Sequence, residues 1–163
     1  MALRPTFRTR LRAFQAMRGD TPDPGFIADL EFLENRDLDL SVRSGAMLAF
    51  NALLVTIGTH PVSASPGAPL SLDAASQPVL TVLSLAALIP LALSSWALLQ
   101  AMLLGEEFDG AGLEGEALRS RLFAAFILSI DAQARRLRQA IFLTLAGAGL
   151  TLVVWGAILA EKM

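Results

Sequence analysis

The residues of this chain best suited to chemistry are arginines that precede its last apolar stretch. Arg135, Arg136 and Arg138 fall within four consecutive positions, and Arg119 and Arg121 lie earlier in the same segment. A guanidinium group presents several N–H donors in one plane, which match the oxygens of a phosphate group. These five side chains are therefore candidate phosphate partners. The alternative is that they serve only as positive charges that fix the orientation of the chain in a membrane.

A second pair of residues, Arg43 and Asn51, stands at the start of the first apolar stretch. Their separation of eight residues is a little over two helical turns, so both lie on nearly the same side of one helix. An amide inside an apolar span turns toward another helix, where a hydrogen bond is worth about 0.6 to 2 kcal/mol. We predict that Asn51 bonds a neighbouring span and that Arg43 either extends to the membrane interface or pairs with Asp39.

The usual signatures of catalysis are missing from the sequence. It has no cysteine, no tyrosine and one histidine, His60, and it contains none of the motifs GxxxxGKS/T, HExxH or GxSxG. Glu106 and Glu107 are adjacent carboxylates, but they belong to an acidic, glycine-rich loop. We expect them only to keep this loop soluble. We predict a protein that is not an enzyme, with no catalytic residue, metal or cofactor and with no nucleic acid polymer as a partner.

Three stretches without any Asp, Glu, Lys or Arg decide the fold class. They cover residues 44–72, 74–105 and 139–160, and each reaches the roughly 20 residues that carry a helix across about 30 Å of hydrocarbon. Apolar residues make up 54% of the chain, and the mean hydropathy of +0.55 is too high for an ordinary soluble domain. The sequence predicts an all-α integral membrane protein with cytoplasmic amphipathic helices and three transmembrane helices, at about 42–60, 78–104 and 139–160.

The positions of the basic residues predict the orientation. Of the 13 basic residues, those from Arg4 to Arg43 precede the first span, those from Arg119 to Arg138 lie between the second and third spans, and only Lys162 follows the third. Cytoplasmic loops carry the excess of Lys and Arg in membrane proteins. The N-terminus and the segment 106–138 are therefore expected in the cytoplasm, and the first loop and the C-terminus on the outer side.

The polar segments divide the chain into two regions. Residues 1–40 form a basic and then an acidic helical segment, and residues 41–163 form the three-span domain with its cytoplasmic helical loop 106–138. Between Leu3 and Arg18, apolar residues recur at helical spacing among arginines, which favours a helix lying on an anionic inner leaflet. A frayed arginine-rich tail is the alternative.

The second half of the cytoplasmic loop is predicted to be a helix that continues into the third span. Its apolar residues share one helical face: Phe123, Ile127, Ile130, Ala134 and Leu137. An apolar stripe outside the membrane must pack on something, and the acidic helix that starts near residue 26 is the nearest candidate.

Two features inside the spans leave alternatives open. Pro90 predicts a kink in the second span, which serves either packing or gating. Gly156 and Ala160 fit the small-xxx-small pattern of associating helices, either within one subunit or between subunits.

Two short patterns at the cytoplasmic ends of the spans resemble those of one known family. Where the first span begins, Arg43 and Asn51 repeat the separation of the basic residue and the asparagine in the pattern D-x-K-A-x-x-L-L-x-x-N. Ahead of the last span, residues 133–140 are similar in their second half to the pattern K-Y/F-x-x-L-R-x-A. Together with the order of helices and spans, these patterns resemble the bacterial membrane effectors of the Pycsar anti-phage systems.

The chain departs from the family patterns at three positions. Arg43 replaces the usual lysine, Ser41 stands where an aspartate is expected, and Gln133 replaces the second lysine. The resemblance implies a protein of the bacterial inner membrane that responds to a cyclic pyrimidine nucleotide and impairs this membrane by oligomerising. The candidate helix-contact or ligand residues are then Arg43, Asn51, Arg135, Arg136 and Arg138.

The competing function is that of an accessory subunit in a larger membrane complex, such as a respiratory or photosynthetic assembly. Such a subunit needs apolar helices, small-residue faces and charged ends, and this chain has all three. Its partners would be other membrane subunits rather than copies of itself. A membrane-bound enzyme is a third option, which the missing motifs disfavour.

The predicted orientation can be tested with single cysteines, because the chain has none of its own. We expect a thiol at Ser65, in the first loop, to react with an impermeant reagent added to intact cells, because that loop is predicted to lie outside. A thiol at Gly112 should react only after the membrane is opened. Labelling at Gly112 but not at Ser65 in intact cells would reverse the orientation.

Overall fold

The computed structural model describes residues 24–103 and 115–163, which form helices and connecting turns without a strand. In chain order the helices are α2 (Pro24–Gly58), α3 (His60–Ser63), α4 (Pro78–Ala86), α5 (Ile89–Leu103) and α6 (Gly115–Lys162). Three segments are long and apolar enough to cross a membrane: Ala28–Gly58, Pro78–Leu103 and Ser120–Lys162.

These findings confirm the helical fold class and the three candidate spans. Insertion, the choice of membrane and the orientation stay predictions. The expected basic helix between Leu3 and Arg18 and the acidic part of the cytoplasmic loop lie outside the described residues.

Two of the helices are much longer than a membrane is thick. Helix α2 has 35 residues and α6 has 48, which correspond to about 52 and 72 Å at 1.5 Å per residue. A hydrocarbon core of about 30 Å accommodates only part of each. The acidic segment and the first span are thus one helix, and the predicted continuation of the cytoplasmic helix into the third span is confirmed.

The second span is broken where the sequence has Pro90. Helix α4 ends at Ala86 and α5 begins at Ile89, because proline has no N–H to donate to the carbonyl four residues earlier and its ring crowds that carbonyl. The break is bridged by a tighter turn, in which the N–H of Leu88 donates to the carbonyl of Leu85 at 3.1 Å. The α-helical pattern resumes when the N–H of Ala92 donates to the carbonyl of Leu88 at 3.0 Å. The structure thus has the predicted helix defect at Pro90 as a break between α4 and α5.

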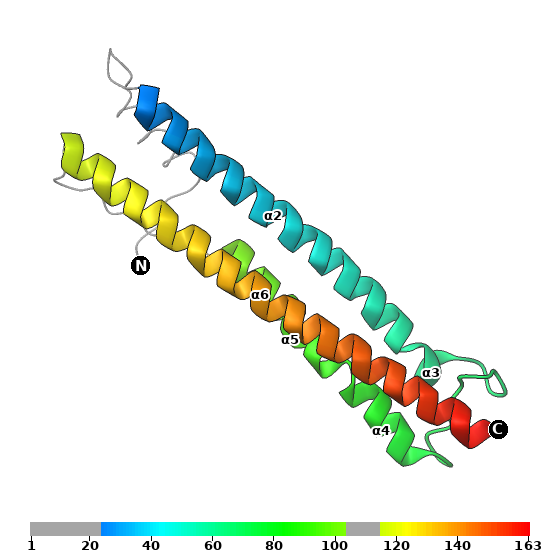
Figure 1. Ribbon diagram of the computed structural model, residues 1–163. Helices are drawn as coiled ribbons and strands as arrows, with labels where there is room; N and C mark the ends of the chain where they lie inside the picture. Colours follow the sequence, from blue (N-terminus) through cyan, green and yellow to red (C-terminus); the bar gives the residue numbers. More distant parts are fainter. Residues whose placement is uncertain (1–23, 104–114) are drawn as a thin grey trace.

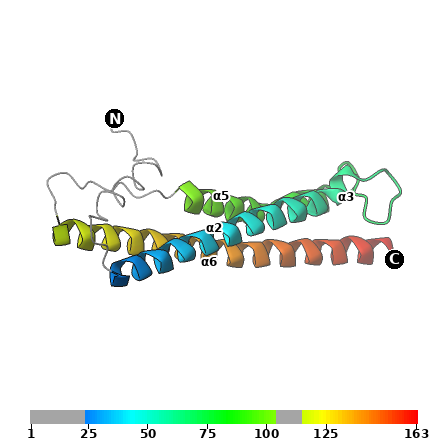
Figure 2. The ribbon, with the colours of Figure 1, turned by 90° about the horizontal axis from the view of Figure 1, so that it is seen from above.

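The three spans form an elongated bundle, in which α2 and α6 run in the same direction and α5 runs against them (Figure 1). Seen from above, α5 stops part of the way along the bundle, and the first parts of α2 and α6 extend beyond its end (Figure 2). We call this two-helix extension the stalk and define it as residues 24–43 of α2 and 120–138 of α6.

The stalk and the bundle share one apolar core. Leu40 from α2, Leu98 from α5, and Ile130 and Leu137 from α6 are buried together. The expectation that the apolar stripe of the cytoplasmic helix packs on the acidic helix is confirmed for Ile130 and Leu137. It is wrong for Ile127, which is 47% exposed. The face of α6 that packs on the core is turned away from Ile127 by about one residue position, or roughly 100°.

Glycines of α6 differ sharply in their surroundings. A Cβ atom on Gly147 would lie 2.7 Å from the side chain and 3.3 Å from the backbone nitrogen of Leu91, which is fully buried on α5. A Cβ atom on Gly156 would meet nothing within 4 Å. Gly156 and Ala160 are both exposed, so their small-residue pattern makes no close helix contact within the described chain, and contact between subunits remains as its other interpretation.

The close approach at Gly147 predicts that Gly147→Ala destabilises the bundle. The new methyl group must displace Leu91, and overpacking of this kind costs about 1 to 3 kcal/mol. Gly156→Ala is the matched control, because it gains the same helix propensity and meets only open space. Unfolding in mixed detergent micelles should show a lower free energy of unfolding for the first variant alone; equal stabilities would contradict the close approach.

Candidate functional site

Three polar side chains from three different helices meet in the interior of the bundle. Asn51 comes from α2, Ser94 from α5 and Thr144 from α6, and none of them is more than 3% exposed. Polar groups buried so completely must find partners within the protein, because apolar surroundings offer none. We call these three residues the polar triad.

The polar triad closes into a ring of hydrogen bonds. Nδ2 of Asn51 donates to Oγ of Ser94 at 2.8 Å, and Oγ1 of Thr144 donates to Oδ1 of Asn51 at 2.7 Å. Oγ of Ser94 lies 2.9 Å from Oγ1 of Thr144 and 2.8 Å from the carbonyl oxygen of Ala140. Since the hydroxyl proton of Thr144 is used on Asn51, the single proton of Ser94 serves either of these two acceptors.

The surrounding sequence explains why these three groups face inward. In α6, Ala140 and Thr144 are four residues apart and share one face, so the carbonyl of Ala140 lies beside the threonine hydroxyl. In α5, Ser94 is the first hydroxyl after the break at Pro90. The ring contains no ionisable group. It can therefore hold the helices together, but it cannot act as an acid or a base.

The structure resolves the two alternatives for Arg43. Its Nε donates to Oδ1 of Asp39 at 2.9 Å, and Nη1 of Arg36 donates to Oδ2 of the same carboxylate at 3.1 Å. The side chain of Arg43 is 61% exposed, and ion pairs in such surroundings contribute less than about 1 kcal/mol. Arg43 is therefore on the surface of α2, apart from Asn51.

The three clustered arginines of α6 are exposed at the base of the stalk. Within the described part of the chain, Arg135, Arg136 and Arg138 have neither a hydrogen bond nor an ion pair from their side chains. In this region a side-chain hydrogen bond joins α6 to α2: Nε2 of Gln133 donates to Oδ1 of Asp37 at 2.9 Å. The arginines thus keep their guanidinium groups available to a ligand or to lipid headgroups.

The predicted site residues do not converge on one pocket. Arg138 precedes Thr144 by six residues, which places it about 9 Å from the polar triad along the axis of α6. The side chain of Arg135 lies on the opposite face of α6 from Thr144, by the spacing of 100° per residue. The structure therefore separates a buried contact group, Asn51, from a set of surface cations.

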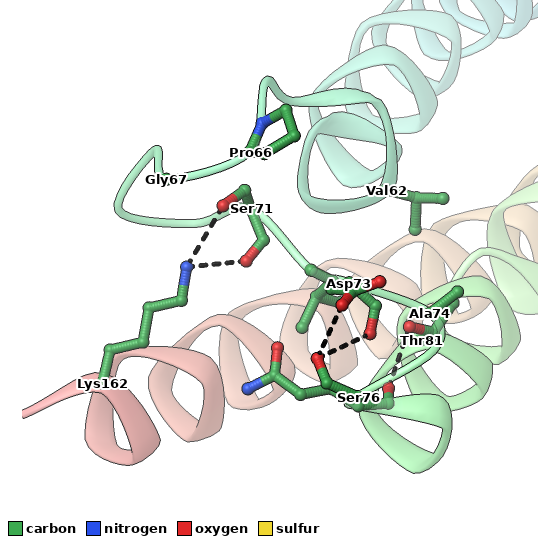
Figure 3. A pocket seen from close by; sticks show the side chains of 11 residues that line it. Val62, Pro66, Gly67, Ser71, Asp73, Ala74, Ser76, Thr81 and Lys162 are labelled. Atoms are coloured by element: carbon green, nitrogen blue, oxygen red, sulfur yellow. Dashed lines mark hydrogen bonds between the residues drawn. The ribbon is translucent and has the colours of Figure 1, made fainter.

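A groove at the other end of the bundle was not foreseen from the sequence. It has a volume of about 700 Å³ and is bordered by the first loop, the start of α4 and Lys162 of α6 (Figure 3). Nζ of Lys162 donates to the carbonyl oxygens of Ser71 at 2.6 Å and Ala68 at 3.0 Å. In the sequence, the only signal of this contact is that Lys162 is the lone basic residue at this end of the chain. Its acceptors are backbone carbonyl groups, which every residue has, so the sequence does not identify them.

Asp73, in the same groove, shapes the turn before α4. The backbone N–H of Ala75 and the hydroxyl of Ser76 donate to its carboxylate at 3.1 and 3.0 Å. These hydrogen bonds to the charged form, with that of Ala75 the larger cause, lower the pKa of Asp73. Both charged groups of the groove thus make hydrogen bonds with neutral groups of the chain itself.

The comparisons with known proteins add no relative. No family model, no curated protein and no solved structure matches this chain. Within the described residues, no group of three or more His, Cys, Asp or Glu side chains is placed to hold a metal ion.

The polar triad predicts different roles for two adjacent serines. Ser94→Ala removes a hydroxyl that joins three helices, and we expect it to lower the free energy of unfolding by about 0.6 to 2 kcal/mol. Ser95→Ala is the control, because Oγ of Ser95 donates only to the carbonyl of Leu91 in its own helix, at 3.0 Å. Unfolding in mixed micelles measures both, and an equal loss at Ser95 would argue against a ring that holds the helices together.

Proposed function

We propose that this chain is a non-enzymatic protein of the bacterial inner membrane that binds a cyclic pyrimidine nucleotide and impairs the membrane by associating with further copies of itself. The observation that supports the proposal best is the set of three arginines at the base of the stalk, which form no ion pair with the described residues. It agrees with what the resemblance to the Pycsar membrane effectors implies.

The chemistry of the arginines favours a phosphate ligand. Arg135, Arg136 and Arg138 are exposed, and no described carboxylate forms an ion pair with them. A cyclic nucleotide carries one negative charge on a phosphodiester, whose two free oxygens accept parallel hydrogen bonds from a guanidinium group. The same chemistry would suit the phosphate of an anionic lipid, so the assay must distinguish the two sources.

The continuity of α6 gives a bound ligand a route to the membrane. The arginines and Thr144 belong to the same helix, and Arg135 precedes Thr144 by nine residues, or about 13.5 Å. No loop separates them, so a movement of the helix at the arginines also acts on the polar triad. A ligand shifts such an equilibrium only by its difference in affinity between two arrangements of the helices, and the dissociated and associated states of the chain are the two that we propose.

The surface of the bundle suits a lipid environment. Large apolar side chains of all three spans point away from the core, among them Phe50, Trp96 and Phe142, which are 47%, 62% and 66% exposed. In water such a surface would be an aggregation hazard, whereas in a bilayer it is ordinary. Association of copies would replace some of these lipid contacts by contacts between helices.

An accessory subunit of a larger membrane complex is the second candidate. The exposed small residues of α6, Gly156 and Ala160, favour it, because such a face admits another helix at close range whatever its origin. In that case the arginines at the base of the stalk would bind lipid headgroups or a neighbouring subunit.

Purified protein in liposomes with a trapped dye tests the proposed function. We expect cyclic UMP or cyclic CMP to bind and to release the dye, and we expect the variant with Arg135→Gln and Arg136→Gln to respond at least about tenfold more weakly, since each charged hydrogen bond contributes about 1.5 to 3 kcal/mol. Arg121→Gln is the matched control, because it removes an exposed arginine from α6 well before the cluster.

The lipid composition separates the two sources of phosphate. Liposomes without anionic lipid should retain nucleotide binding if the arginines recognise the nucleotide. If neither nucleotide binds or causes leakage, and the particle extracted from native membranes contains other subunits at a fixed ratio, the effector function is wrong and the accessory function stands.

A further inference from the structure

The end of the bundle that holds the groove contains a buried hydrogen-bond donor without an acceptor. Nε1 of Trp155 in α6 is buried, and among the described residues it is the one buried side-chain polar atom that no protein group bonds. Most buried polar groups in proteins have a partner, because an unpaired donor loses its hydration and gains nothing in return. The packing around Trp155 therefore holds the indole in an unfavourable position.

The first loop and α4 cover this part of α6. A small buried cluster lies here, and four half-buried side chains pack against it. The cluster consists of Ala87, Val154 and Ile158, and the four are Leu70, Leu72, Leu80 and Trp155. Leu70 and Leu72 belong to the loop and Leu80 to α4, so the cover comes from one continuous segment of the chain. We call this segment, residues 59–87, the arm.

The arm is attached at two points that touch each other. It follows Gly58, the last residue of α2, and precedes Leu88, and a Cβ atom on Gly58 would lie 2.5 Å from Cδ2 of Leu88. Within the arm, the N–H of Leu72 donates to the carbonyl of Pro61 at 2.8 Å, which ties the loop to α3. A segment that is bonded to itself and has neighbouring ends can turn about those ends as one unit.

The break at Pro90 weakens the second of these attachments. In an unbroken helix the carbonyl of Ala86 would receive the N–H of residue 90, and proline has none to donate. On the far side of the break, α5 is held by five buried residues, whereas Ser84 is the one buried residue of α4. A rotation at the break therefore displaces α4 and not α5. Of the two interpretations of Pro90, packing or gating, this asymmetry favours gating.

Lys162 fastens the arm to α6. Apart from the hydrogen bonds at the two ends of the arm, those that join it to the other described helices all come from Nζ of this residue. The acceptors are the carbonyl oxygen of Ala68 and both oxygens of Ser71, of which Oγ lies at 3.3 Å (Figure 3). Lys162 is exposed, and its ammonium group pairs with no described carboxylate. One surface side chain thus supplies the directional contacts that keep the arm in place.

We propose that the arm opens at the groove, with the break at Pro90 as the hinge and Lys162 as the latch. In the closed form, which the structure shows, the arm buries Nε1 of Trp155. In the open form the bonds of Lys162 are released and the arm turns about Gly58 and Leu88. The indole N–H then reaches acceptors in water or at lipid headgroups, where tryptophan is favoured.

The two forms are balanced because opposing contributions act on the same segment. Apolar packing and the latch favour the closed form, and the unpartnered indole favours the open one. Removing a single contact then shifts the populations of both forms. The arm lies at the other end of the bundle from the arginines of α6 and requires no nucleotide, so its test is independent of the proposed function.

The fluorescence of Trp155 reports the position of the arm. The chain has two tryptophans, so Trp96→Phe leaves Trp155 as the single emitter. In liposomes with acrylamide on both sides, Lys162→Met should raise the quenching constant at least about twofold and shift the emission to longer wavelength, because three hydrogen bonds from a charged donor are lost. Glu161→Gln is the matched control, because it changes the neighbouring exposed charge and leaves the latch in place. Equal quenching with and without Lys162→Met would contradict the latch.

A tether distinguishes opening from damaged packing. In the Trp96→Phe protein, Ser71→Cys with Lys162→Cys removes the latch and supplies two thiols to a chain that has none. The quenching should first be as high as in Lys162→Met, and it should return to that of Trp96→Phe after a short bis-maleimide joins the two cysteines within one chain. N-ethylmaleimide should leave it high. Quenching that stays high after tethering would show that lost packing, and not a moving arm, exposes Trp155, and the proposal would be wrong.

Two prolines separate the hinge from the rest of the arm. Pro90→Ala restores the N–H that the carbonyl of Ala86 lacks, so the effect of Lys162→Met on quenching should fall to less than about half. Pro78→Ala should leave that effect unchanged, because Pro78 stands at the start of α4, where no intrahelical N–H is needed. The same effect of Lys162→Met in both proline variants would place the pivot elsewhere and overturn the hinge.

Discussion

The bundle depends on one constraint, which is that polar groups buried between apolar helices must be satisfied by the protein itself. Asn51, Ser94 and Thr144 meet this constraint in a closed ring that includes one group from each span. A ring of this kind fixes the depth of each helix relative to the other two, since sliding any helix by one residue would break two hydrogen bonds. Apolar side chains alone set no such alignment, because lipid tails and leucines are equivalent surroundings.

The depth set by the ring carries over to the stalk because α2 and α6 are continuous. Asp37 meets Gln133 well beyond the end of α5, at nearly the offset in residue number that Asn51 has from Thr144. The arginines of α6 are thereby held at the end of the bundle where the stalk begins. The proposed ligand site inherits its geometry from the same three buried groups.

Sequence reasoning identified one member of the ring, Asn51, and missed the other two, Ser94 and Thr144, for a physical reason. An asparagine amide cannot satisfy itself within its own helix, so Asn51 in an apolar span predicts a partner on a neighbour. A threonine hydroxyl can bond the carbonyl four residues earlier, as Thr151 does with Gly147 at 2.9 Å. Nothing in the sequence separates Thr144 from Thr151, and only packing decides which hydroxyl turns to another helix. The continuity of α6 and the break at Pro90 were predictable because they follow from the absence or presence of a single breaker. The continuity of α2 across the predicted boundary at residues 40 and 41 and the tie of Lys162 to loop carbonyls were not predicted.

The tie at Lys162 gives α6 polar attachments at two separate levels. Its C-terminal end is bonded to the first loop, and the polar triad holds it 18 residues earlier in the chain, a separation of about 27 Å. Between Thr144 and Ser120, the described contacts of α6 include the apolar packing of Ile130 and Leu137 and the hydrogen bond from Gln133 to Asp37. Rotation of α6 about its own axis is therefore resisted by directional bonds near its C-terminal end and mainly by non-directional apolar contacts near its start.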